Sequence, residues 1–241
     1  MHTLLTQEFN SARQELLAYL CRLVVRPQVA DELLQSTYLR CFEARDRLPD
    51  NREGVRAWLF KVASNLAFDE LRRHAHWREV MLQDLRHAAE SSEEFMARSS
   101  ALVGTPETRA IAREHLLACL ACTLRNLPER KAAAVLLKEV HGFDHAETAG
   151  ILAASTTQVK NWLQEGRAFL HARYGETCAL LSKTGVCHQC VELDGFFAAG
   201  QGSPLTAGQD LEARFAIATE SREQPWGAWH SIMLELIAQL D

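Results

Sequence analysis

Hydrophobic residues recur at three- and four-residue steps through the first third of the chain, which is the spacing of one face of an α-helix. The pattern predicts a first helix over residues 7–25, and Pro27 follows where a helix can begin but cannot continue. It predicts a second helix around residues 29–42 and a third from about 52 to 74. The turn-forming sequence LPDN at 48–51 separates these two helices.

A second helical block follows a stretch of different character. Residues 81–106 are rich in small, polar and acidic side chains and end in Gly and Pro, so we expect a flexible acidic linker there. Periodicity then predicts one helix over residues 111–127 and another that opens at Pro128 and ends at Gly142.

Two helix-start signals come close together after Gly142. The sequence DHAE at Asp144 has an acidic N-cap with Glu three residues on, and STTQ at Ser155 has the form of a capping box. We therefore expect helices at about 144–153 and 155–172, joined by a turn of one or two residues. That arrangement is a helix-turn-helix.

The last part of the chain, residues 175–241, is called the C-terminal tail below. It holds three cysteines, a Gly/Ser/Pro stretch near 200–208 and an amphipathic segment over 226–240. Because no strand pattern of any length is present, the predicted fold class is all-α. The predicted organisation is a helical domain over residues 1–80, the linker over 81–106, a four-helix domain with the helix-turn-helix over 107–174, and a partly helical C-terminal extension over 175–241.

The net charge of −5 argues against a DNA-binding protein, but its distribution answers part of the objection. Residues 56–78 carry five Arg or Lys against two Asp or Glu, and residues 122–175 carry seven against five. The tail is acidic, with three basic residues against nine acidic ones in 176–241. Local charge decides whether a surface binds nucleic acid, so these modest basic blocks favour weak DNA binding by the isolated chain.

The helix-turn-helix is the first candidate site. A recognition helix places its N-terminal residues against base edges in the major groove, and basic residues anchor it to phosphates. The hydroxyls of Ser155, Thr156 and Thr157 and the ammonium of Lys160 lie in its first turns. The alternative is an ordinary helical hairpin with a good cap, which the pattern alone does not distinguish.

The second candidate is the segment RAWLFKVASNLAFDELRR at residues 56–73, which mixes basic and aromatic side chains. Such a mixture suits unstacked single-stranded bases. In the alternative, Trp58 and Phe60 belong to the core and the basic residues form a solvated face. The residues alone favour that alternative.

Taken together, these segments resemble the extracytoplasmic-function sigma factors of bacterial RNA polymerase. Residues 30–48, ADELLQSTYLRCFEARDRL, are similar to the polymerase-docking segment of that family, and residues 56–73 to its promoter-melting segment. Residues 124–170 resemble its second domain, which reads the −35 element. The resemblance covers about residues 7–173, with both motifs in the family's order.

The resemblance implies a role for individual residues and a set of partners. It implies a non-enzymatic subunit that binds core RNA polymerase and promoter DNA, with an anti-sigma factor as a candidate further partner. The sequence itself shows no run of about 18 apolar residues and no signal-peptide pattern, so we expect a cytoplasmic protein with no membrane span. The residues implied in polymerase docking are Asp31, Glu32, Gln35, Arg40 and Phe42. Those implied at the −10 element are Asn65, Asp69, Arg72 and Arg73. Those implied at the −35 element are Ser155, Thr156, Thr157, Val159, Lys160 and Arg167.

The chain also departs from the family pattern on the recognition helix. Trp162 and Glu165 occupy two positions that are usually basic, and Asp144 and His145 replace the usual serine and aromatic before the first helix of the pair. Each lost phosphate contact lowers the salt dependence of binding by about one unit. We therefore expect this domain to bind its element weakly.

The seven cysteines do not form the even set of a secreted disulfide framework. In the tail, Cys187 and Cys190 form a CxxC and Cys178 lies nine residues earlier, which makes these three the candidate ligands of zinc or another thiophilic metal. A thiol redox switch and incidental buried cysteines are the alternatives, and no other cofactor is implied. Cys119 and Cys122 lie among leucines, where core positions are expected.

Two other classes of protein compete with the sigma factor. One is a stand-alone helix-turn-helix regulator with a metal- or redox-sensing tail, and the other is a scaffold or metal sensor that does not bind DNA. A simple regulator has no use for docking and melting segments, so the first 75 residues discriminate. An enzyme is disfavoured because no Gly-rich phosphate loop, HExxH or GxSxG is present in the sequence.

Overall fold

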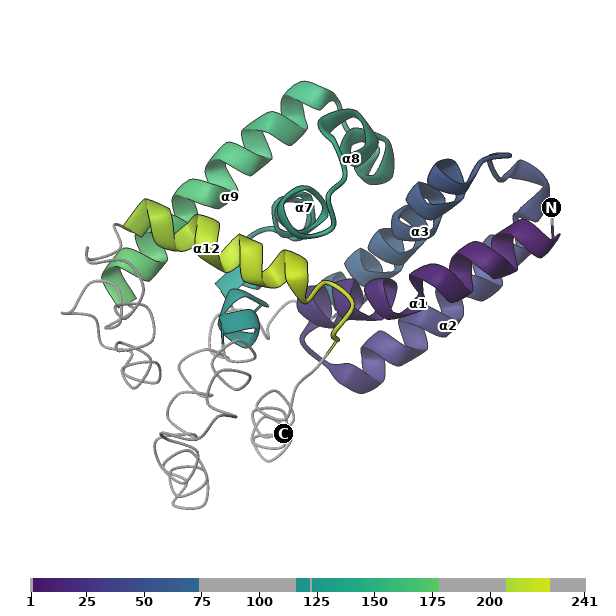
Figure 1. The fold of residues 1–241 in the computed structure, drawn as a ribbon, viewed down its shortest axis with the longest axis horizontal. Helices are drawn as coiled ribbons and strands as arrows, with labels where there is room; N and C mark the ends of the chain where they lie inside the picture. Colours follow the sequence, from purple (N-terminus) through teal and green to yellow (C-terminus); the bar gives the residue numbers. More distant parts are fainter. Residues whose placement is uncertain (1, 74–115, 122, 178–206, 226–241) are drawn as a thin grey trace, which may run out of the picture.

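The computed structural model describes residues 2–73, 116–121, 123–177 and 207–225, and every element in these ranges is helical (Figure 1). The all-α fold class predicted from the sequence is confirmed. The predicted linker, the three tail cysteines and the amphipathic segment at 226–240 lie outside the described residues.

The N-terminal unit, residues 2–73, is a bundle of three long helices. Its elements are α1 (His2–Val24), α2 (Pro27–Glu43), the short 3₁₀ helix η1 (Arg45–Arg47) and α3 (Arg52–Arg73). Helix α1 begins five residues before the predicted start because Leu5 extends its apolar stripe and is only 1% exposed. Tyr19 on α1 and Ser64 on α3 join their hydroxyls at 2.7 Å in the core of the bundle.

The C-terminal unit, residues 116–177, contains the helix-turn-helix. Residues 116–121 and 123–124 are helical, followed by α7 (Glu129–Val135), the π-helical turn η3 (Leu136–Val140), α8 (His145–Leu152) and α9 (Thr156–Thr177). In η3 the amide of His141 bonds the carbonyl of Leu136 at 3.0 Å, one residue further back than in an α-helix. Gly142, with φ +73°, then reverses the chain as glycine commonly does after a helix.

Both helix starts of the helix-turn-helix have the predicted caps. Asp144 accepts the amide of Glu147 at 2.8 Å, and the Glu147 carboxylate accepts the amide of Asp144 at 2.7 Å. Ser155 and Gln158 make the same reciprocal pair, at 3.2 and 2.9 Å. Ala153 links the two helices in the left-handed region, with φ +50°. The recognition helix α9 continues five residues beyond the predicted end.

Helix α12 (Ala207–Glu220) was not predicted, because its start lies in the Gly/Ser/Pro stretch of the tail. It lies across α9 and η3 (Figure 1). Its apolar face is short: Leu211, Phe215 and Ala218 are buried in the same cluster as the other helices. Helix α12 of the tail therefore packs against the rest of the protein.

The two units are in direct contact. Helix α3 packs against α7 and α8, and α1 also touches α7. One continuous cluster of buried apolar residues runs through both units. Within the described ranges, no helix is both long and apolar enough to cross a membrane.

Candidate nucleic-acid interface

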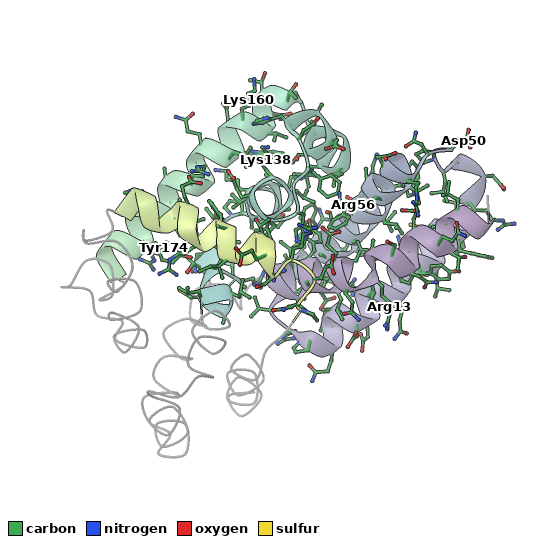
Figure 2. The ribbon with its side chains drawn as sticks, viewed as in Figure 1. Arg13, Asp50, Arg56, Lys138, Lys160 and Tyr174 are labelled. Carbon is green, nitrogen blue, oxygen red and sulfur yellow. The ribbon has the colours of Figure 1, made fainter. Side chains whose placement is uncertain are left out.

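The first turns of α9 form an exposed polar surface. Ser155, Thr156, Thr157 and Lys160 are all exposed, and Lys160 lies at the outer end of the helix in Figure 2. Val159 is 0% exposed and belongs to the core, so its predicted role at DNA is wrong. Its side chain faces inward because α9 is amphipathic: the polar residues of its first turns lie on the solvent side, and an apolar residue on the opposite side packs against the core.

Two features of α9 bear on its departures from the family pattern. Trp162 is half-buried and packs against the core, and Glu165 forms an ion pair with Lys131 of α7. Both residues therefore hold α9 on its own unit. Gly166 lets α7 approach closely, because a Cβ there would lie 2.7 Å from the Val135 side chain.

Arg167, a predicted DNA contact, is engaged in two ion pairs. Its guanidinium donates to Glu139 at 2.7 Å and also to Glu212 of the tail helix α12. Its partial burial lowers its pKa, but the two carboxylates outweigh that effect and raise the pKa above its ordinary value. In this arrangement a phosphate would have to displace the tail carboxylate.

The C-terminal turns of α3 present a second exposed polar surface. Asn65, Arg72 and Arg73 are exposed, whereas Asp69 is half-buried. Asp69 pairs with Arg72 one turn on, and Glu70 lies 3.4 Å from Arg73. These predicted −10 residues thus share one end of one helix.

The N-terminal half of α3 faces the other unit. Arg56 donates to the Glu15 carboxylate at 2.7 Å and to the carbonyl of His141 at 3.0 Å, and its guanidinium lies 4.1 Å from the Phe143 ring centroid. Phe60 is 0% exposed and meets Phe143 edge-on at 4.9 Å between centroids. For Phe60, the core alternative is therefore correct. Figure 2 places Arg56 between α3 and the C-terminal unit.

Glu15 and His141 form the polar centre of this contact. The Nδ1 of His141 lies 3.1 Å from a Glu15 oxygen. Burial lowers the pKa of His141 to about 4, although the hydrogen bond with Glu15 opposes the shift. Burial acts to raise the pKa of Glu15, but hydrogen bonds from His141 and Arg56 outweigh it and lower that pKa. At neutral pH the carboxylate is thus charged and the ring neutral, with Nδ1–H as the donor.

Comparison with protein families now gives these surfaces a context. The family described as Sigma-70 region 2 matches residues 9–77, and the family described as Sigma-70 region 4 matches residues 117–170. The two matches cover about half of the chain and coincide with the two helical units. The chain belongs to the sigma-70 family. Its relatives include members named as extracytoplasmic-function sigma factors, as the sequence resemblance predicted.

Relatives and a solved structure resemble this chain over different extents. The ECF RNA polymerase sigma factor SigG of Mycobacterium tuberculosis is 28% identical over 170 residues, which are 66% of this chain and 45% of SigG. RNA polymerase sigma factor SigZ of Bacillus subtilis is 25% identical over 188 residues, 78% of this chain and 90% of SigZ. The sigma factor RpoE of Bartonella quintana, solved in complex with the anti-sigma factor NepR, aligns with a TM-score of 0.48 at 17% identity, covering 69% of this chain and 94% of RpoE. The chain thus spans less than half the length of SigG.

The predicted docking residues of the chain lie on α2. Asp31, Glu32, Gln35 and Arg40 are exposed, and Phe42 is half-buried beneath the Arg45 guanidinium. Sequence reasoning missed Leu39, which is 59% exposed and lies beside a hollow between α2 and η1. The sequence could have indicated this exposure, because Leu39 falls outside the apolar stripe of α2. The residues lining the hollow are Ser36, Leu39, Arg40, Glu43, Ala44, Asp46 and Arg47.

The predicted metal ligands of the chain, Cys178, Cys187 and Cys190, lie outside the described residues. Among the described residues, no group of three His, Cys, Asp or Glu side chains is placed to hold a metal ion. Cys41 is buried in the N-terminal unit, and burial raises the pKa of its thiol to about 12. Cys119 is half-buried against the core, as expected for that pair, and Cys122 is not among the described residues.

Proposed function

We propose that this chain recruits core RNA polymerase to promoters that carry a −10 and a −35 element. One observation carries the proposal: the chain's two sigma-70 regions each present an exposed polar helix end, Asn65 to Arg73 on α3 and Ser155 to Lys160 on α9. Hydroxyl, amide and basic side chains at a helix end are the groups that contact bases and phosphates. The chain then works beside the polymerase in the cytoplasm and has no catalytic activity of its own.

Polymerase docking is proposed for the exposed face of α2. Asp31, Glu32, Gln35 and Arg40 lie there with the exposed Leu39, so an apolar contact is surrounded by charge. That composition is typical of a specific protein interface, with an apolar centre and a polar rim. An anti-sigma factor is a candidate competitor for the same face.

Charge reversal on α2 tests the docking proposal. The double variant Asp31→Arg with Glu32→Arg should weaken binding to core polymerase by more than about tenfold, because like charges across an interface repel. Binding of the variant to −35 duplex should be unchanged. The measurement is a pull-down and titration with core enzyme.

A matched control reverses two exposed acids on the same unit outside the docking segment, Asp50→Arg with Glu53→Arg. It should retain core binding. If the Asp31 and Glu32 variant binds core enzyme as tightly as this control, docking occurs elsewhere. A chain that binds promoter duplex but no core enzyme at all would be a stand-alone regulator.

Two kinds of substitution on α9 separate base contacts from phosphate contacts. Thr156→Ala or Thr157→Ala should cost about 1–3 kcal/mol on the preferred −35 sequence and little on others. Lys160→Ala should weaken binding to all sequences and lower the salt slope by about one unit. Binding to a library of duplexes at two salt concentrations measures both.

Lys138→Ala is the control for Lys160, because Lys138 is a half-buried lysine of the same unit that lies on η3 and not on α9. It should leave the salt slope unchanged. An equal loss on every sequence for the threonine variants would remove them as base-reading residues.

A further inference from the structure

Arg22, near the end of α1, is bound by the tail. The residue is only 2% exposed, and its guanidinium donates to the carbonyls of Ser221 at 2.7 Å, Gln224 at 3.2 Å and Arg222 at 3.5 Å. Burying a cation is costly unless hydrogen bonds compensate. Three carbonyls of the turn after α12 supply this compensation, from a segment almost 200 residues away in the chain.

The other end of the same segment is fixed to the C-terminal unit. Arg214 is 2% exposed, with its guanidinium 4.1 Å from the Tyr174 ring centroid on α9. The Thr219 hydroxyl lies 2.9 Å from the carbonyl of Glu139 in η3 and 2.8 Å from that of Phe215 in its own helix, and Glu212 pairs with Arg167. Residues 207–225 therefore contact both units, as Figure 1 shows for α12 and its following turn.

We propose that residues 207–225 are a latch that holds the two DNA-binding units of this chain together and must release before both promoter elements are bound. The proposal rests on the proposed function for its consequence at promoters. The latch itself rests only on the contacts of Arg22, Arg214, Thr219 and Glu212.

Distance makes the latched arrangement incompatible with a two-element promoter. The −10 and −35 elements are named for positions about 25 base pairs apart, which is about 85 Å of duplex. Helix α3 is about 33 Å long and α8 about 12 Å, at about 1.5 Å per residue. Since α3 touches α8, and α9 begins four residues after α8 ends, the two exposed helix ends cannot lie 85 Å apart while the units stay in contact.

Charge gives the latch a second effect. Glu212 occupies the guanidinium of Arg167, which is a proposed phosphate contact on α9. Carboxylate and phosphate oxygens compete for the same donors of an arginine. Release of the latch therefore both separates the units and frees Arg167 from one of its two carboxylates.

The test weakens the latch from its two sides. Arg22→Glu places a carboxylate against the three tail carbonyls, on the same face of α1 as the Glu15 carboxylate. The resulting repulsion should expel the turn. Phe215→Ser removes the buried apolar anchor of α12 and leaves the N-terminal unit unchanged. Glu223→Gln is the control, because Glu223 is an exposed acid of the same turn and no described residue pairs with its carboxylate. Circular dichroism measures whether each full-length variant retains its helices.

Three measurements on the full chain test the latch. Small-angle scattering should show a larger radius of gyration for Arg22→Glu and Phe215→Ser than for Glu223→Gln and the unaltered chain. Hydrogen exchange should be faster in α12 and in the turn. Assembly with core polymerase on a two-element promoter should tighten by roughly threefold to tenfold, because a larger fraction of the chain is already open.

Two results would overturn the latch. Scattering and exchange identical to the unaltered chain in both variants would show that other contacts keep the units together. Loss of helicity in both variants would make α12 a structural part of the C-terminal unit. If both variants expand but none of the chains binds polymerase, the latch stands and the proposed function fails, so the two failures are distinguishable.

Discussion

Helices α3 and α9 have the same length, 22 residues, and each has an end that we propose to contact promoter DNA, yet their surroundings differ. The first turns of α9 are in solvent, and two capping boxes fix the start of the helix pair. Helix α3 is covered along its first half by the other unit, through Arg56 and Phe60. The polar end of α9 thus begins its helix in solvent, whereas the polar end of α3 follows a half that is packed against the other unit.

The difference teaches how the chain can separate two tasks. A duplex can be read by a preformed exposed helix, because base edges are accessible in the groove without melting. Capture of unpaired bases needs a site that opens only when the DNA does. In this chain Arg56 and Phe60 of α3 lie in the contact between the units, whereas the proposed −10 residues further along α3 are exposed or half-buried.

The largest expected effect tests how much α3 depends on that interface. Phe60→Ala should lower the free energy of unfolding by about 3–5 kcal/mol, because it leaves a cavity among Tyr19, His141 and Phe143. Phe169→Ala, at a half-buried position of α9, should cost distinctly less. Urea unfolding of the two variants measures both, and equal losses would contradict the asymmetry between the helices.

Acid should weaken the contact between the units and spare the start of α9. The pKa of His141 is about 4 in the folded chain against an ordinary 6.5, so the unfolded chain takes up the proton first. Stability contributed by this ring is therefore present above pH 6.5 and is lost as the pH falls toward 4. The groups that face it are Glu15, Arg56 and Arg22, and the lowered pKa of Glu15 adds loss below its ordinary 4.5.

The slope should reach up to about 1.4 kcal/mol per pH unit for the single proton. Chemical denaturation at several pH values between 7 and 4 measures this slope. His141→Gln should flatten the slope between pH 6.5 and 4.5, and His171→Gln, at an exposed position of α9, should not. A slope unaffected by His141→Gln would place the acid sensitivity elsewhere.

The smallest expected effect concerns the turn of the helix-turn-helix. Ala153 has φ +50°, which costs a residue with a Cβ about 1–2 kcal/mol. Ala153→Gly should stabilise the chain by up to about 1 kcal/mol, since the added entropy of the unfolded chain offsets part of the gain. Ala154→Gly, next in the chain, should destabilise it. Thermal unfolding of the pair gives the sign, and a loss for both would show that the turn is not strained.

Patterns that are local in the chain were predictable. Helix periodicity and the two capping boxes depend on residues three or four positions apart, and the structure has both where the sequence indicates them. The docking and recognition residues were assigned by resemblance, and most of them lie at exposed positions. Val159 was the exception, because a motif assigned by resemblance does not tell which side of the helix is buried.

Contacts between distant residues were not predictable. Nothing in the sequence around Arg22 indicates that its partners are carbonyls near residue 222, since backbone acceptors carry no residue type. Helix α12 was missed because it begins among Gly, Ser and Pro and has only three buried apolar side chains among its described positions. The pairing of Arg56 with His141 likewise required the two units to be placed together.

The π-helical turn at Leu136–Val140 makes the fit between the units tolerant of one particular deletion. It accommodates one residue more than an α-helical turn would over the same rise. A chain one residue shorter within this turn would close an ordinary α-helical turn there, and the residues after it would keep their orientation. The carbonyl of His141 and the ring of Phe143 would then still face Arg56. A one-residue insertion, by contrast, would rotate the residues after it by about 100° and turn both groups away from Arg56.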